Sequence, residues 1–199
     1  MDNIYTEMLT RNKAYLKHTP FEHDTNLGQF DSRHCVAIVA KGTWTFNRDW
    51  NLVDTLCTEL LDTGKWVQPH LHHTFLVLRG WGSAVPFDQD IKLHPIPKYS
   101  VTFDRIIPVK TGITLCGIPS IDINAVRDDI RTNYYVDENC KLDIAHATLL
   151  RAKHAVSQQE TDKIVHMCEN IAHGEFARLD IESFDFVVAD RLLHTFARV

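Results

Sequence analysis

The sequence predicts an α+β domain in which a strand–helix–strand unit occurs twice. In both units an apolar, β-branched run is followed by an amphipathic helix and then by a second apolar strand. The second strand of each unit also begins with a histidine that is followed two residues later by a threonine. The first unit comprises 34–42, 51–64 and 72–80, and the second comprises 112–119, 120–135 and 143–151. Two similar halves predict two antiparallel sheets that face each other across a central cleft, with the helices outside.

The N-terminal residues 1–33 form an extension ahead of the first unit. A helix is expected over 2–16, because Ile4, Met8 and Leu9 fall on one side of it. The following residues, 19–32, are rich in polar and turn-forming types and predict a loop.

The helix of the first unit has an apolar face and a clear end. Its apolar residues recur at helical spacing, and Gly64 follows as a stop signal. The residues of this face are Leu52, Val53, Leu56, Cys57, Leu60 and Leu61.

The helix of the second unit shows the same kind of pattern. Ile123, Val126 and Ile130 lie on one face, and Ser120 and Asp122 are placed to cap its N-terminus.

The remaining segments complete one domain spanning 1–199. A strand is expected over 98–109 and another over 177–190, and Ser157 with Glu160 has the spacing of a capping box before a further helix. With them, the two lobes consist of about 34–80 and 101–190.

Composition narrows the class of partner. The chain has 21 Lys and Arg against 26 Asp and Glu, a formal net charge of −5, whereas proteins that hold long duplex nucleic acid usually carry a basic surplus. The five cysteines are odd in number and lack CxxC spacing, which favours a reducing, cytoplasmic compartment. No apolar stretch reaches the length of a membrane span. We therefore expect a small ligand and no membrane.

The two His-x-Thr motifs carry the chemistry. In a strand, residues i and i+2 share a face, so His72 lies with Thr74 and His146 with Thr148. Cleavage of a phosphodiester needs a base for the attacking oxygen and an acid for the leaving oxygen, and imidazole, with a pKa of about 6.5, can serve as either. Threonine hydroxyls can donate to the phosphate oxygens. This scheme requires no cofactor and no metal.

The segments HHTFLVL and HATLLR resemble the two signature motifs of the 2H phosphoesterase superfamily, which includes LigT-like and cyclic phosphodiesterase-like proteins. The resemblance implies a bilobal fold and the cleavage of small nucleotides: 2′-5′ oligoadenylates, cyclic dinucleotides or 2′,3′-cyclic phosphates. It also implies that His72 and His146 are the acid/base pair and that Thr74 and Thr148 bind phosphate. Arg151 resembles an arginine that often follows the second motif, but its odd spacing from His146 places it on the opposite face of a regular strand.

The sequence is also compatible with other interpretations of the site. One alternative is a binding module, whose cleft holds a nucleotide or an RNA end without turnover. His70 and His72 share a strand face and could be ligands of a zinc ion, for which a third ligand is missing nearby. Trp81, Tyr134 and Tyr135 flank the motif strands and are candidates for stacking on a base.

Overall fold

The computed structural model describes residues 2–25, 27, 35–79, 96–133, 144–171, 174–189 and 195–198. The described helices are α1 (Asp2–Leu16), α2 (Trp50–Asp62), α3 (Ile123–Asn133) and α4 (Gln158–Asn170). The described strands are β1 (Cys35–Phe46), β2 (Trp66–Val67), β3 (His73–Arg79), β4 (Ser100–Val109), β5 (Gly112–Pro119), β6 (Ala145–Ala152), β7 (Ala177–Ala189) and β8 (Thr195–Arg198). The α+β class predicted from the sequence is confirmed.

The described strands belong to one hydrogen-bonded sheet. Its order is β2-β6-β5-β4-β7-β1-β3, β8 pairs with β7, and the pairs are antiparallel. The sequence predicted two separate sheets, but β4 pairs with β7 over Ser100–Phe103 and joins the two halves. Local periodicity identifies strands, whereas this junction depends on contacts between segments far apart in the chain.

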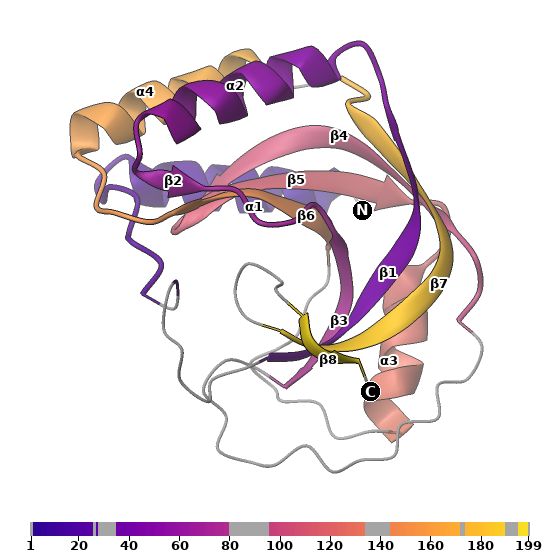
Figure 1. Ribbon diagram of the computed structural model, residues 1–199. Coiled ribbons are helices and arrows are strands. Elements are labelled where there is room, and N and C mark those ends of the chain that lie inside the picture. Colours follow the sequence, from indigo (N-terminus) through magenta and orange to yellow (C-terminus); the bar gives the residue numbers. More distant parts are fainter. Residues whose placement is uncertain are drawn as a thin grey trace.

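The sheet curves so strongly that its two arms approach each other. β3 lies at one end of the strand order and β6 near the other, yet the two strands contact each other. Figure 1 shows β3 and β6 beside one another at the inner side of the curved sheet. The curvature therefore brings together the strand that follows His72 and the strand that contains His146.

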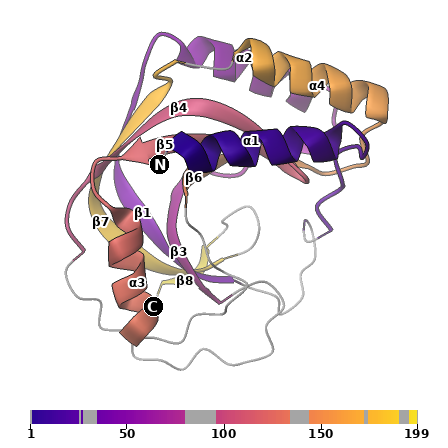
Figure 2. The same ribbon diagram turned by 180° about the vertical axis from the view of Figure 1, so that it is seen from behind.

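Helices α1 and α4 pack against β4, and α2 packs against β2. α1 contacts β4 and α4, and α4 also contacts β4. In Figure 2, α1 crosses the back of β4 and β5 while α2 and α4 lie together above the sheet. Among the helices of the described ranges, none is long and apolar enough to cross a membrane.

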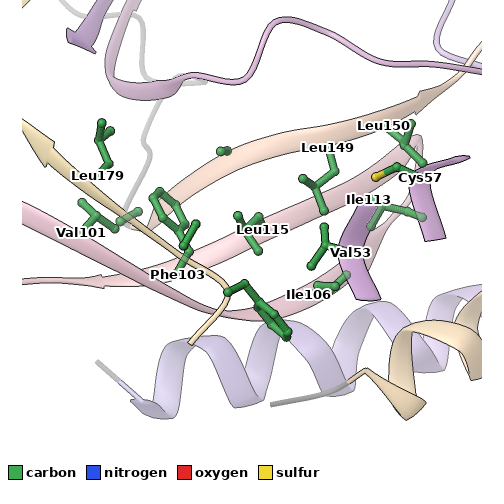
Figure 3. Close-up of a cluster of buried hydrophobic side chains, with 14 of the residues drawn as sticks. Val53, Cys57, Val101, Phe103, Ile106, Ile113, Leu115, Leu149, Leu150 and Leu179 are labelled. Carbon is green, nitrogen blue, oxygen red and sulfur yellow. The ribbon is translucent and has the colours of Figure 1, made fainter. Parts of the chain in front are cut away.

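A single large apolar cluster joins the helices to the sheet (Figure 3). Val53 and Cys57 of α2 belong to the same cluster as Phe103 of β4 and Leu115 of β5, and Phe103 is fully buried. Burial of apolar surface of this kind is the main favourable contribution to folding.

The helix faces predicted from periodicity are largely confirmed, with two exceptions. Ile4 and Leu52 were expected on buried faces but are 40% and 50% exposed. In α1 the buried positions are instead Tyr5 and Leu16. Each exposed residue lies next to a buried one, Tyr5 or Val53, so Ile4 and Leu52 stand at the edge of the apolar face of their helix.

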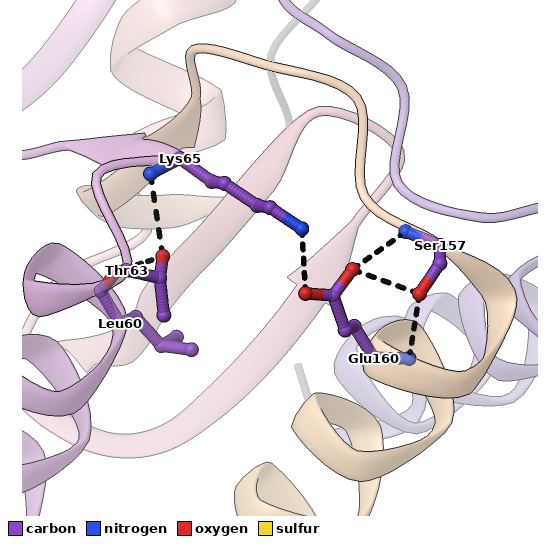
Figure 4. A network of polar contacts seen from close by, with 5 residues as sticks. All are labelled: Leu60, Thr63, Lys65, Ser157 and Glu160. Carbon is purple, nitrogen blue, oxygen red and sulfur yellow. Dashed lines mark hydrogen bonds and ion pairs between the residues drawn. The ribbon is translucent and has the colours of Figure 1, made fainter.

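The predicted capping box at the start of α4 is confirmed. The Ser157 hydroxyl accepts a hydrogen bond from the Glu160 backbone N–H, and the Glu160 side chain accepts one from the Ser157 backbone N–H. The Glu160 carboxylate also pairs with Lys65 at 2.6 Å, which ties α4 to the turn after α2 (Figure 4). That turn contains Gly64 at a φ of 70°, as its role as a helix stop predicted.

Candidate active site

His72 lies immediately before β3 rather than within it. Its half-buried ring places Nδ1 2.6 Å from the carbonyl oxygen of His70. A carbonyl only accepts, so Nδ1 carries the hydrogen and donates it. The Nε2 atom of the neutral ring then holds a lone pair and is available to a ligand. The histidine is therefore oriented by its own chain in a tautomer that suits proton transfer at Nε2.

Both motif strands contain a β-bulge directly after the threonine. In β3, Thr74 is opposite Val39 and Leu76 is opposite Ile38, so Phe75 is an extra residue. In β6, Thr148 and Leu150 face the consecutive residues Thr114 and Ile113, so Leu149 is extra in the same way. The extra residues Phe75 and Leu149 are both buried in the main core.

The bulge in β6 changes the face on which Arg151 lies. Arg151 is opposite Gly112, and Gly112, Thr114 and Cys116 alternate regularly along β5. Because Thr148 is opposite Thr114 and His146 is opposite Cys116, Arg151 lies on the same face as both motif residues. The odd spacing that argued against this position in a regular strand is corrected by the one extra residue.

His146 is half-buried, and its Nδ1 atom has no hydrogen-bond partner in the described part of the chain. The pKa of this imidazole is lowered to about 3, first by burial and then by its neighbours His73, His72, Arg127 and Arg151. Polar atoms that are buried without a partner are uncommon in folded proteins, and at a catalytic site they are candidates for ligand contact.

His72 experiences the same positive surroundings. Burial lowers its pKa, the hydrogen bond to His70 raises it, and the charges of Arg151 and His70 lower it. Arg151 thus acts on His72 and on His146, although the two histidines are 74 positions apart in the sequence. Arg151 supplies positive charge near both rings and Arg127 supplies it near His146, and such surroundings favour an anionic ligand.

His73, between His72 and Thr74 in the first motif, is a structural residue. Its ring is fully buried, with Nδ1 donating to the carbonyl oxygen of His146 at 3.1 Å and Nε2 accepting from the Tyr99 hydroxyl at 3.2 Å. Its pKa is lowered to about 3, mainly by burial, so the ring is neutral. The residue between His72 and Thr74 therefore links the first motif directly to the backbone of the second.

Arg127 of α3 makes a second link between the motif strands. Its guanidinium is fully buried and donates to the carbonyl oxygens of Phe75 at 2.7 Å and Ile144 at 3.0 Å. One signal was present in the sequence, since Arg127 falls on the same helical face as Ile123 and Ile130. A polar residue on a core-facing position predicts a buried hydrogen-bonding role.

The two motif threonines differ in how far they are exposed to solvent. Thr148 is 8% exposed and Thr74 is half-buried. Trp81, Tyr134 and Tyr135, the predicted stacking residues, lie outside the described residues.

In the described residues, neither a metal site nor the cavity beside α1 involves the candidate histidines. Across the described ranges, no group of three His, Cys, Asp or Glu side chains is placed to hold a metal ion. A cavity of about 50 Å³ lies between α1, β4 and α4, and the candidate histidines do not line it.

A scan of the sequence against models of protein families finds no match, and a search of curated proteins finds none. The two motifs and the geometry around them therefore carry the functional argument.

Proposed function

We propose that this protein is a metal-independent phosphodiesterase of the 2H type, acting on small nucleotide phosphodiesters. The observation that supports this most directly is that the charge of Arg151 lowers the pKa of both His72 and His146, which come from different strand–helix–strand units. Two imidazoles near one guanidinium offer two proton-transfer groups and a positive charge for one phosphate.

A pseudo-twofold, bilobal arrangement is part of the proposal. The strand order places β6, β5 and β4 on one side of the β4–β7 junction and β3, β1 and β7 on the other. In each half the motif strand pairs with the first strand of its own unit, and each motif carries a bulge one residue after its threonine. An internal repeat accounts for these shared features, including the matching bulges.

The environments of the two histidines suggest their roles. The hydrogen bond from His72 to His70 stabilises the protonated ring, whereas the pKa of His146 is held at about 3. Groups whose environments separate their pKa values tend to divide into acid and base. We therefore assign His146 as the base and His72 as the acid.

For a 2′-5′ linkage the proposed steps balance as follows. His146 takes the proton of the free 3′-hydroxyl, whose oxygen attacks phosphorus, and the bond from phosphorus to the 5′-oxygen breaks. His72 gives a proton to that leaving oxygen, so the products are a 2′,3′-cyclic phosphate and a 5′-hydroxyl. Arg151 and the hydroxyls of Thr74 and Thr148 stabilise the charge on the non-bridging oxygens.

The test is turnover of a small substrate panel in the presence of EDTA. The panel comprises a 2′-5′ oligoadenylate, a 2′-5′-linked cyclic dinucleotide, a 3′-5′-linked one and a nucleoside 2′,3′-cyclic phosphate. We expect the wild-type protein to cleave at least one of them, because the scheme uses only side chains. Chromatography of the products identifies the bond that breaks. Loss of all turnover in EDTA, with recovery on addition of zinc, would contradict the proposal.

A binding module is the second candidate, and one observation favours it. Both histidines have lowered pKa values, so the unliganded site lacks a protonated acid at neutral pH. A bound phosphodiester anion would raise both pKa values, which reconciles catalysis with this state. A wild-type protein that binds a panel member without cleaving it, with the same affinity in His72→Ala, would support the binding module instead.

A further inference from the structure

The segment between α1 and β1 is anchored to the sheet beside Arg151. Phe21 is 1% exposed and packs edge-on against Trp66 of β2, with ring centroids 5.1 Å apart. The backbone N–H of Asp24 donates to the carbonyl oxygen of Ala152 at 2.9 Å. Trp66 pairs with Ala152 in the sheet, so these contacts hold the segment at the end of β6. The sequence pattern indicated only a loop here.

This anchored segment delivers a buried carboxylate to Arg151. The Asp24 side chain is 2% exposed, and its Oδ2 lies 3.1 Å from a terminal guanidinium nitrogen of Arg151, whose side chain is 18% exposed. A carboxylate so deeply buried is costly unless it is paired with a cation. The contact therefore constrains where the guanidinium lies.

The contact with Asp24 matters because the backbone alone does not fix where the charge of an arginine side chain lies. The β6 bulge sets the face from which its side chain leaves the strand, but several rotatable bonds separate Cα from the charge. The charge of Arg151 lowers the pKa of His72, and the charges of Arg127 and Arg151 lower the pKa of His146. Arg151 is the arginine common to both.

We propose that Asp24 is a positioning residue that holds the Arg151 guanidinium beside His72 and His146, so that the N-terminal extension forms part of the site. This inference deepens the proposed function and rests on it for the effect on turnover. Asp24 itself does not touch the reacting atoms in this proposal and acts through Arg151.

The experiment is a double-mutant cycle in the full-length protein, with Asp24→Ala, Arg151→Met and the double variant. Glu22→Ala is the control, because Glu22 lies on the same segment and pairs with Lys110 instead, at 2.9 Å. We expect Asp24→Ala to lower kcat/KM roughly 10- to 100-fold and to have little further effect when Arg151 is already Met. Glu22→Ala should retain wild-type turnover. Equal effects of Asp24→Ala with and without Arg151 would overturn the proposal.

A second readout does not depend on turnover. NMR titration of the His72 ring should show its pKa rising in Asp24→Ala, because the guanidinium no longer stays near, and the same rise in Arg151→Met and in the double variant. An unchanged pKa in folded Asp24→Ala would overturn the proposal. A fall in the His72 pKa would also overturn the proposal, because it would mean that Arg151 stays in place and that Asp24 only offsets its charge.

These readouts distinguish failure of the proposed function from failure of the role proposed for Asp24. If the wild-type protein cleaves no panel substrate, the proposed function fails while the titration still decides the role of Asp24. If Asp24→Ala does not fold, Asp24→Asn keeps the side-chain shape and one acceptor oxygen. The Asp24→Asn variant should lose less activity than Arg151→Met. The proposal would be overturned if the loss of log kcat/KM in Asp24→Asn/Arg151→Met equalled the sum of the losses in the two single variants.

Discussion

Replacing either motif histidine by alanine should lower kcat on the preferred substrate by about 10²- to 10⁴-fold, the usual contribution of one acid or base. His72→Ala removes the ring that Nδ1 holds against the His70 carbonyl, and His146→Ala removes the ring whose Nδ1 lacks a partner among the described residues. Because the proposed mechanism uses both rings in one step, the double variant should be little slower than the worse single variant.

Initial rates measured at saturating substrate check this result. His166→Ala is a matched control, since His166 is exposed on α4 and lies beside Glu169. Full activity in either His72→Ala or His146→Ala would remove that residue from the proposed acid/base pair.

His73→Gln should make the protein's stability less dependent on acid pH. The folded-state pKa of His73 is about 3, below the ordinary value of about 6.5 for an unfolded chain. Between these values the unfolded state binds the extra proton, so stability is complete above pH 6.5 and falls as the pH drops toward 3. At pH 5 one such histidine accounts for a loss of about 2 kcal/mol.

Urea unfolding at pH 7 and at pH 5 measures the effect. The wild-type protein should lose about 2 kcal/mol more than His73→Gln between the two pH values, although the variant is less stable at pH 7 because Tyr99 and the His146 carbonyl lose their partner. His154→Gln, at an exposed position, should follow the wild-type profile. Equal pH dependence in wild type and His73→Gln would show that His73 titrates normally in the folded protein.

Local sequence patterns predicted much of the fold. β-Branched runs located β1, β5 and β6, and the Ser157–Glu160 spacing located the start of α4, because these features depend on neighbours within a few residues. The joining of the strands into one curved sheet was not predicted, since the β4–β7 pairing connects residues about 80 positions apart.

The candidate site was also predicted only in part, because local patterns do not encode contacts between distant segments. The two His-x-Thr motifs were visible, but a period of two residues cannot anticipate the bulges at Phe75 and Leu149, and the bulge at Leu149 decides the face of Arg151. Asp24 had no local signal, because a single acidic residue in a polar segment is ordinary until the fold buries it.

The central claim is that two histidines from two strand–helix–strand units act as base and acid on one phosphodiester. The most direct measurement is the pH dependence of kcat/KM in EDTA for wild type, His72→Ala and His146→Ala. The account predicts a bell-shaped wild-type profile, because the base His146 must be neutral and the acid His72 protonated. The residual activity of His146→Ala should lose the acidic limb, and that of His72→Ala the basic limb. A wild-type rate that rises continuously with pH, or that collapses in EDTA, would contradict the account.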